Sequence, residues 1–355
     1  MKFTPTSAGV SDPFEQAPGV PPSSLRVVAI GGGTGLSTLL RGLRRHVAFP
    51  DWPASDPQHI SDLAAVVTVT DDGGSSGRLR HDFNMLPPGD IRNCMIALSA
   101  EEDLLSKLFA YRFKTGAGLG GHSFGNLFIT ALSEITGDFA HAVQLASKIL
   151  ATRGRIYPAT TSNATVVARM EDGSFVRGET NITASKQRIA ELTLDPPNAS
   201  AMPETLDAIH RADLITVGPG SLYTSLITNL LVQGIPSALA GATGIRVFVC
   251  NLMTQANESL GLTASEHIER IYEHTRAPVF DYAVINTTRF SPDTLSRYAQ
   301  ENASPIFADI ERVEKLGVRC VAGDFATEDT VVRHASDRVT DALLALGQSK
   351  SPNRL

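Results

Sequence analysis

The apolar residues of this chain fall into short runs that alternate with longer segments of helical period. Most of the runs are rich in Val and Ile and show no polar alternation, which is typical of parallel strands buried on both faces. The predicted strands are 25–30, 63–70, 213–217, 245–250, 281–286 and 318–322. The predicted helices are 36–46, 90–113, 123–136, 139–151, 203–211, 221–233, 263–275, 291–302 and 329–346. We therefore expect an α/β, Rossmann-like, doubly wound fold with a mostly parallel sheet.

Between residues 155 and 194 the pattern changes to that of short antiparallel strands. Two apolar segments, 164–170 and 174–179, flank Glu171-Asp172-Gly173, a sequence that favours a hairpin turn. A further strand is predicted at 188–194. We expect 155–194 to form a small antiparallel insertion in the α/β fold.

Length and composition favour one folded domain with a tail at each end. The chain has 355 residues, of which 42% are hydrophobic, and this is enough for a large core. We assign 25–347 to a single α/β domain. Residues 1–24 are rich in Pro, Ser, Thr and Gly and lack the basic and apolar regions of a signal peptide. A disordered tail is expected there, and 348–355 is assigned as a second tail.

Charge, hydropathy and cysteine usage restrict the partners and the compartment. The formal net charge is −6, so no global basic field attracts nucleic acid. No apolar run approaches the ~20 residues that a membrane span requires. Cys94, Cys250 and Cys320 are far apart and show no paired metal spacing, which favours buried thiols in a reducing compartment. These observations predict a cytoplasmic protein without a nucleic-acid partner or a membrane span.

The first predicted strand leads directly into a glycine turn, Gly31-Gly32-Gly33-Thr34-Gly35, followed by leucines at helical spacing. This order predicts an anion site, because glycine allows close backbone approach while the amides and dipole of the helix N-terminus face a phosphate. We name Gly32, Gly33, Thr34 and Gly35 as candidate diphosphate ligands. The alternative is a turn that only packs the helix on the strand.

The same turn departs from both common phosphate motifs. A dinucleotide fingerprint requires a third glycine where Leu36 stands, so NAD is a less favoured ligand. A Walker loop requires a Lys, and the turn contains none, which disfavours ATPase or kinase chemistry of that kind.

A second polar segment, 70–80, follows the predicted strand 63–70. Because ligands collect outside the carboxyl ends of parallel strands, this segment is expected to share the crevice with the glycine turn. Asp71 and Asp72 are candidate ligands of Mg²⁺ or of ribose hydroxyls, and backbone amides and hydroxyls are candidate phosphate donors. The phosphate candidates are Ser75, Ser76 and Arg78. The alternative is an ordinary solvated turn.

Further polar or glycine-rich loops lie at predicted strand ends or helix starts. They add the candidates Asn126, Gly218, Gly220, Ser221, Asn251 and Thr254. Asp90 has two interpretations, a helix cap or a direct ligand, and His122 is either a general acid/base or a structural histidine. Several such loops together favour one large nucleotide-shaped crevice.

Six motifs in this order resemble the YvcK branch of the CofD-like superfamily. They are Gly-Gly-Gly-Thr-Gly-Leu-Ser, Asp-Asp-Gly-Gly-Ser-Ser-Gly-Arg-Leu-Arg, Leu-Pro-Pro-Gly-Asp-Ile-Arg-Asn, Gly-His-Ser-Phe-Gly-Asn-Leu, Gly-Pro-Gly-Ser-Leu-Tyr-Thr-Ser and Asn-Leu-Met-Thr-Gln. Arg297-Tyr-Ala-Gln-Glu and Val332-Arg-His334 resemble further motifs of that branch, and the resemblance covers 25–346. It implies a cytoplasmic gluconeogenesis factor that binds UDP-sugars such as UDP-N-acetylglucosamine and is needed for cell shape and wall synthesis during gluconeogenic growth.

The related CofD enzymes transfer phospholactate from a nucleotide diphosphate donor to a deazaflavin, with Mg²⁺. This chain departs from the branch at Gln255-Ala-Asn-Glu258, where Pro-Gly-Glu is usual, and it lacks the Pro-Asp-rich stretch of the transferases after Asp72. The nucleotide half of that chemistry is therefore expected here, and transfer to a deazaflavin is not.

The expected fold brings two residues of the C-terminal motifs to the same edge of the crevice. Tyr298, in a predicted helix, is expected at the crevice edge, where its ring would stack on or hydrogen-bond the uridine–sugar portion. Arg333, near the start of another predicted helix, is expected to clamp the diphosphate with support from His334. The alternative is a packed Tyr and an exposed Arg.

Two function classes stay open: a nucleotide-sugar sensor, and a transferase that moves a phosphoryl-linked group from a nucleotide diphosphate donor to a small acceptor. No nucleophile–base pair is recognisable, which favours the sensor, although phosphoryl transfer can proceed through positioning alone. We assign no catalytic residue. Homo-oligomerisation and an unidentified protein partner are also left open.

Overall fold

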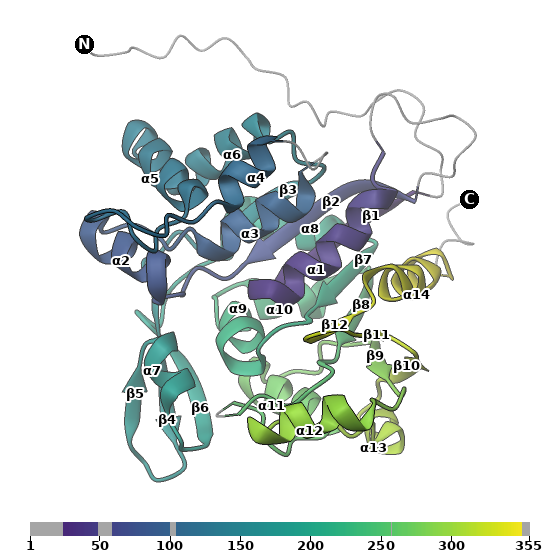
Figure 1. Cartoon of the computed structure of the whole chain (residues 1–355). Coiled ribbons are helices and arrows are strands. Elements are labelled where there is room, and N and C mark those ends of the chain that lie inside the picture. The colour runs from purple at the N-terminus through teal and green to yellow at the C-terminus, as the bar shows by residue number, and fades with distance from the viewer. Residues whose placement is uncertain (1–23, 49–58, 100–103, 257, 350–355) are drawn as a thin grey trace.

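A seven-stranded parallel sheet forms the centre of the computed structural model, which describes residues 24–48, 59–99, 104–256 and 258–349 (Figure 1). The strand order is β10-β9-β8-β7-β1-β2-β3, and every neighbouring pair is parallel. The strands are β1 (Leu25–Gly31), β2 (Ile60–Val67), β3 (Arg155–Pro158), β7 (Leu214–Val217), β8 (Ile245–Val249), β9 (Tyr282–Asn286) and β10 (Arg319–Gly323). The predicted α/β fold with a mostly parallel sheet is confirmed.

Helices cover both faces of this sheet because its central strands are apolar along most of their length. Within β1, Val28 and Ile30 pack on one face, while Val27 and Ala29 pack on the other. The first face is covered by α8 (Pro203–Arg211), the π-helix η2 (Leu222–Ile227), α10 (Ile235–Gly241) and α11 (Ala264–Thr275). The second is covered by α1 (Gly33–Leu43), α3 (Gly89–Leu98), α6 (Phe139–Ile149) and α14 (Ser336–Ser349).

The chain changes direction across the sheet between β1 and β7. From β1 it proceeds to β2 and β3 at one edge, and it then returns to β7 on the opposite side of β1 before adding β8, β9 and β10. The carboxyl ends of β1 and β7 therefore flank a topological switch point, where open α/β sheets bind ligands.

A small antiparallel arm projects from the sheet, at the lower left of Figure 1. It contains β4 (Thr165–Met170), β5 (Phe175–Arg177) and β6 (Ile189–Asp195) in the order β5-β4-β6, together with α7 (Glu179–Ala184). The strand expected over 174–179 ends at Arg177, since Gly178 takes a φ of +89° and α7 begins after it.

The first residues of the expected insertion belong to the main sheet instead. Arg155–Pro158 pairs with β2 in parallel as β3, and its apolar residues Ile156 and Tyr157 are buried. Residues 348 and 349, assigned from the sequence to the C-terminal tail, belong to α14, which continues to Ser349. Residues 1–23 and 350–355 of the two predicted tails lie outside the described residues.

Several helices differ from the sequence prediction. The helix expected over 90–113 is divided into α3 and α4 (Leu104–Ala110), and that over 221–233 is a π-helix followed by α9 (Thr228–Leu230). The segment 70–80, expected as a loop, contains the start of α2 (Gly74–Phe83). The remaining helices of the described residues are η1 (Arg44–His46), α5 (Phe124–Thr136), α12 (Pro292–Gln300) and α13 (Ile310–Lys315).

The helix predicted over 329–346 begins too early. Its first part is β12 (Val332–His334), which pairs antiparallel with β11 (Ala326–Glu328), and only then does α14 start. The physical reason is the pairing with β11 and the burial of Val332, neither of which a three-residue strand signals in its own sequence.

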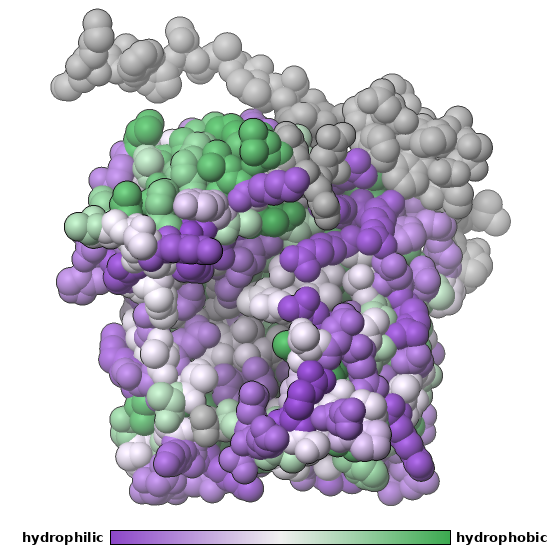
Figure 2. Space-filling model, viewed as in Figure 1, coloured by the Kyte–Doolittle hydropathy of each residue, from purple (hydrophilic) through white to green (hydrophobic). Residues whose placement is uncertain are grey.

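Apolar surface gathers in one area of the face that Figure 2 shows. Figure 2 shows it over α4, α5 and α6, where Leu104 and Ile135 are 77% and 80% exposed. Within the ranges given above, no helix combines the length and the apolar content needed to cross a bilayer.

Candidate functional site

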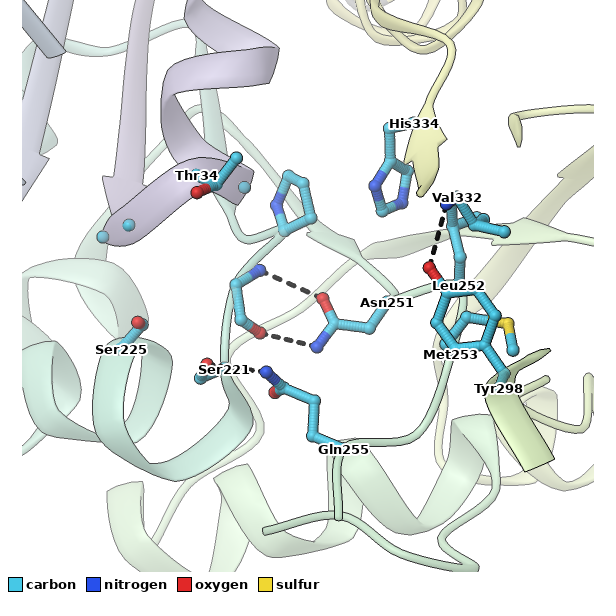
Figure 3. A pocket seen from close by; sticks show the side chains of 15 residues that line it. Thr34, Ser221, Ser225, Asn251, Leu252, Met253, Gln255, Tyr298, Val332 and His334 are labelled. Carbon is cyan, nitrogen blue, oxygen red and sulfur yellow. Dashed lines mark hydrogen bonds between the residues drawn. The ribbon is translucent and has the colours of Figure 1, made fainter. Parts of the chain in front are cut away.

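A cleft of about 290 Å³ lies at the switch point, where the turns after β1 and β7 meet (Figure 3). We call it the glycine cleft. Its lining residues are Gly32, Gly33, Thr34, Gly35, Pro219, Gly220, Ser221, Ser225, Asn251, Leu252, Met253, Gln255, Tyr298, Val332 and His334. Eight of the residues predicted from the sequence are therefore brought together here: Gly32, Gly33, Thr34, Gly35, Gly220, Ser221, Asn251 and Tyr298.

The N-terminus of α1 forms one wall of the glycine cleft. Gly32 is its N-cap and has no side chain to cap the helix, and the N–H of Gly33 donates to Asp90 Oδ2 instead. Gly33 takes a φ of +62°, which an L side chain rarely adopts. A Cβ on Gly35 would lie 2.4 Å from the carbonyl oxygen of Pro219, so the two turns approach each other at backbone distance. Glycine is thus required at Gly33 for the positive φ and at Gly35 for the close approach of the two turns.

Asn251, at the end of β8, fixes the turn that follows β7. Its Oδ1 accepts from the N–H of Gly220 at 3.0 Å, and its Nδ2 donates to the carbonyl of the same residue at 2.6 Å (Figure 3). Nearby, Gln255 Nε2 donates to Ser221 Oγ at 3.0 Å. The amide of Asn251 is therefore a positioning group for Gly220, and each of its polar atoms can make one further hydrogen bond.

Tyr298 and His334 form the opposite wall. The hydroxyl oxygen of Tyr298 accepts from the N–H of Val332 at 2.9 Å, so α12 holds β12 against the cleft. His334 Nε2 lies 3.0 Å from the carbonyl oxygen of Cys250, and burial lowers the pKa of this imidazole to about 4. His334 is therefore neutral near pH 7 and donates through Nε2 to that carbonyl.

Arg333 lies between two residues that line the cleft but is not itself part of the lining. Side chains alternate along a strand, so Val332 and His334 face the cleft while Arg333 is exposed on the other side of β12. The structure therefore does not place Arg333 where it was expected, next to a diphosphate on the glycine turn.

A second pocket, of about 250 Å³, adjoins the N-termini of α2 and α3. We call it the arginine pocket. It is lined by Asp71, Gly73, Gly74, Ser75, Ser76, Gly89, Asp90, Arg92, Asn93, Arg112 and Asn126. The predicted residues Asp71, Ser75, Ser76 and Asn126 are here, so the single crevice expected from the sequence is resolved into two pockets.

A buried hydrogen-bond network forms one side of the arginine pocket. Asn126 Nδ2 donates to Ser75 Oγ at 3.1 Å, and Ser75 Oγ lies 3.0 Å from His122 Nδ1. Arg92 donates to Asn126 Oδ1 at 3.0 Å and to Asn93 Oδ1 at 2.7 Å. His122 is buried and belongs to this network through its contact with Ser75. Burial, and then the charge of Arg78, lower the pKa of its imidazole.

Asp90 connects the two pockets. Its Oδ2 accepts from the N–H of Gly33 at 2.8 Å, across 57 residues of sequence. The N-cap of α3 is Pro88, so Asp90 does not cap its own helix. Burial, and then the negative charge of Asp71, raise the pKa of Asp90 to about 6. The interpretation of Asp90 as the cap of α3 is therefore wrong. Its carboxylate instead accepts from the Gly33 amide, which was expected to face phosphate.

Asp71 and Asp72 diverge although they are adjacent in sequence. Asp71 Oδ1 accepts from the N–H of Gly73 at 2.9 Å at the arginine pocket, whereas Asp72 Oδ1 accepts from the N–H and hydroxyl of Thr180 on the arm, at 2.8 and 2.6 Å. The described residues contain no group of three or more His, Cys, Asp or Glu able to hold a metal. Mg²⁺ binding by Asp71 and Asp72 stays a prediction.

Three other predicted residues lie outside both linings. Arg78 is exposed and donates to the carbonyl of Gly120 at 2.9 Å. Thr254 exchanges hydrogen bonds with Ser304, as the Thr254 N–H donates to its carbonyl at 2.7 Å and Thr254 Oγ1 accepts from its N–H at 2.9 Å. Gly218 precedes the cleft residue Pro219 and has a φ of +89°. Thr254 and Gly218 therefore support the loops that form the glycine cleft.

A comparison with known families assigns this architecture. Residues 27–326 match the family model described as 2-phospho-L-lactate transferase CofD. The chain belongs to the CofD family. Within it, the resemblance to the YvcK branch is confirmed, because curated relatives named gluconeogenesis factor match over most of the chain.

Two such relatives and one solved structure show how far the similarity extends. The gluconeogenesis factor of Halalkalibacterium halodurans is 43% identical over 90% of this chain and 95% of its own length. That of Bacillus subtilis is 41% identical over 90% of this chain and 98% of its own length. A crystal structure of a UPF0052-family protein from Bacillus halodurans matches with a TM-score of 0.85 and 42% identity, covering 91% of this chain and 99% of that one.

Part of the site in this CofD-family chain could not be found by sequence reasoning. Arg112 stands in none of the quoted motifs, and no local signal marks it. Gln255 ends the quoted motif Asn-Leu-Met-Thr-Gln but was not named as a candidate ligand. Arg92 and Asn93 lie within the quoted Leu-Pro-Pro-Gly-Asp-Ile-Arg-Asn motif, but that motif by itself indicates only the start of a helix. Arg92 and Asn93 were detectable in the sequence only as a polar pair near the start of the helix that also contains Asp90.

Proposed function

We propose that this CofD-family protein is a cytoplasmic regulatory factor that binds a nucleotide sugar of the UDP-N-acetylglucosamine type in the glycine cleft. Through that ligand it would report precursor supply to cell-shape and wall-synthesis functions during gluconeogenic growth. The relatives named gluconeogenesis factor support the physiological part of the proposal. The resemblance to the YvcK branch supports the choice of ligand.

The observation that carries the proposal is the place and chemistry of the glycine cleft. It lies at the switch point between β1 and β7, where α/β sheets bind nucleotides. None of the described residues that line it is Asp, Glu, Lys or Arg. A nucleoside or sugar fits such a neutral polar lining. The diphosphate would be held at the N-terminus of α1 by amides other than that of Gly33, which donates to Asp90.

Binding is tested by calorimetry with UDP-N-acetylglucosamine, UDP and NAD. Thr34 is exposed at the cleft, so Thr34→Ala removes one hydroxyl donor to a charged ligand, a loss of ~1.5–3 kcal/mol or about tenfold to over a hundredfold in affinity. Thr38→Ala is the matched control, because Thr38 lies one turn further along α1 and donates to the carbonyl of Thr34 at 2.9 Å.

The proposal predicts that wild type and Thr38→Ala bind UDP-N-acetylglucosamine equally, that Thr34→Ala binds it weakly, and that NAD binds less well. Absence of binding by wild type, or equal binding by both variants, would contradict it. Complementation of a deletion strain on gluconeogenic carbon then tests the cellular role. Wild type should restore normal cell shape, and Thr34→Ala should not.

A further inference from the structure

The arginine pocket contains two cations that no carboxylate neutralises at contact distance. Arg92 is only 9% exposed, and its guanidinium donates to Ser123, Asn126 and Asn93, all of them neutral. Arg112 donates to the carbonyl of Gly121. Within the part of the chain that the structure describes, neither arginine forms an ion pair. A buried cation held only by neutral groups is costly unless an anion joins it.

Arg92 is also incompletely hydrogen-bonded. Its Nε is buried and has no hydrogen-bond partner among the described residues, although Arg92 lines the pocket. Burial, and then the charge of Arg112, lower the pKa of Arg92, so the two cations lie close enough to repel each other. Buried polar groups are nearly always satisfied, and an anion between the two arginines would both join the guanidinium and offset the repulsion.

Ser76 adds a hydroxyl to the same wall. It is 4% exposed and lines the pocket, and its Oγ makes no hydrogen bond within the part of the chain that the structure describes. This oxygen approaches the N-terminus of α3 closely, since a Cβ on Gly89 would lie 2.3 Å from it. The hydroxyl is therefore free to donate to a ligand atom in the pocket.

The N-terminus of α2 adds backbone donors. The helix has ten residues, and among the described residues it has neither a side-chain cap nor an acid in its first turn. Its first amides have no intrahelical partner, and together with the helix dipole they favour an anion. The donors of the pocket therefore come from α2, from Arg92 and Asn93 on α3, and from Arg112.

Two carboxylates restrict which anion fits. Asp71 and Asp90 line the same pocket, and their charges disfavour a bare polyanion. Carboxylate oxygens accept hydrogen bonds from hydroxyl groups. A ligand that carries both a phosphate and hydroxyls satisfies the two kinds of group at once.

We propose that the arginine pocket is a binding site for a hydroxyl-bearing phosphate ester, with the phosphate on Arg92, Arg112, Ser76 and the N-terminus of α2, and with hydroxyls toward Asp71 and Asp90. The phosphate has two sources, the nucleotide sugar of the glycine cleft or a separate phosphorylated metabolite. The site does not depend on the nucleotide proposal, because its donors are different residues.

The test is calorimetry of the full chain with glycerol 3-phosphate, inorganic phosphate and glycerol. Glycerol 3-phosphate should bind saturably and more tightly than inorganic phosphate, and glycerol should not bind. Arg112→Gln should weaken glycerol 3-phosphate at least about tenfold, because a hydrogen bond to a charged group is lost. Arg112 is exposed, so this variant is expected to fold.

Lys114→Gln is the matched control. Lys114 is exposed two residues after Arg112 and does not line the pocket. The variant therefore removes one positive charge nearby without removing a hydrogen-bond donor of the pocket. It should bind glycerol 3-phosphate as wild type does. Absence of saturable binding by wild type, or an equal effect of the two variants, would overturn the proposal.

A second arm separates the two sources and the two proposals. With UDP-N-acetylglucosamine present at saturation, loss of glycerol 3-phosphate binding would support the pocket as the site of the nucleotide's own phosphate, whereas retained binding would support a separate metabolite. Thr34→Ala should retain glycerol 3-phosphate binding in either case, because Thr34 lines only the glycine cleft. A wild-type protein that binds the monoester but no nucleotide sugar would contradict the proposed function and leave this site supported.

Discussion

The glycine cleft and the arginine pocket are neighbours with a similar backbone arrangement, but the lining of the cleft is uncharged and that of the pocket is charged. Each uses a helix N-terminus after a parallel strand, α1 after β1 in the cleft and α2 after β2 in the pocket. Among the described residues, the cleft has no ionisable group other than Tyr298 and the neutral His334, whereas the pocket has two arginines and two aspartates. The comparison teaches that the same arrangement of glycine turn and helix can present different chemistry, because the surrounding side chains set the charge of each lining.

The largest expected effect comes from breaking the glycine cleft while leaving the arginine pocket intact. Gly35→Ala places a Cβ 2.4 Å from the carbonyl oxygen of Pro219, so backbone must move. We expect a loss of stability of ~1–3 kcal/mol or more and loss of nucleotide-sugar binding. Urea unfolding and calorimetry measure the two effects.

Gly241→Ala is the control for that variant. Gly241 ends α10, has no atom of the described residues within 4 Å of an added Cβ and does not need a positive φ, so stability should change little. If Gly35→Ala were as stable as Gly241→Ala and bound ligand normally, the close contact between the two turns would not matter. Glycerol 3-phosphate binding should survive in both variants.

The second effect concerns the residue that joins the two sites. The pKa of Asp90 is raised from 3.8 to about 6 by burial and then by the charge of Asp71. The contribution of this group to stability is therefore fully present below pH 3.8 and is lost as the pH rises through about 6. Asp90→Asn keeps an acceptor for the N–H of Gly33 but removes this titration. Relative to wild type, the variant should gain up to about 3 kcal/mol between pH 4 and pH 7.

Urea unfolding of Asp90→Asn and wild type at the two pH values checks this sign. Glu179 also has a raised pKa, of about 9, through burial and the charges of Asp71 and Asp90. It is present in both proteins, so the difference between them isolates most of the effect of Asp90. A stability difference that is the same at both pH values would show that Asp90 carries no buried charge.

The smallest expected effect concerns the wall of the glycine cleft that Tyr298 and His334 form. Tyr298→Phe removes the acceptor for the Val332 N–H and should cost ~0.5–1.5 kcal/mol, because one hydrogen bond is lost in a partly buried position. Hydrogen exchange of the Val332 amide should be faster in the variant. Unchanged exchange and stability would mean that α12 does not hold β12 in place.

Most of the sheet could be predicted from the sequence because its strands are continuous apolar runs. The strands predicted at 25–30 and 281–286, for example, differ from β1 and β9 by a single residue. Short elements could not be predicted in this way. β12 has three residues, too few to show alternation, and its place depends on pairing with β11.

The glycine turns of the site were visible in the sequence because they follow apolar strands directly. The partners of those turns were not visible, because they arrive through tertiary packing. Asp90 reaches Gly33 across 57 residues, and Asn251 reaches Gly220 across 31. Arg333 illustrates the opposite case. Strand alternation places this motif residue outside the cleft lining, and contact between Arg333 and a ligand stays a prediction.

A crystal structure of the protein with UDP-N-acetylglucosamine would test the central claim most directly. The account predicts a nucleoside or sugar in the glycine cleft beside Asn251 and Tyr298, with the diphosphate at the N-terminus of α1. A nucleotide sugar bound elsewhere on the chain, with the glycine cleft containing only solvent, would contradict it.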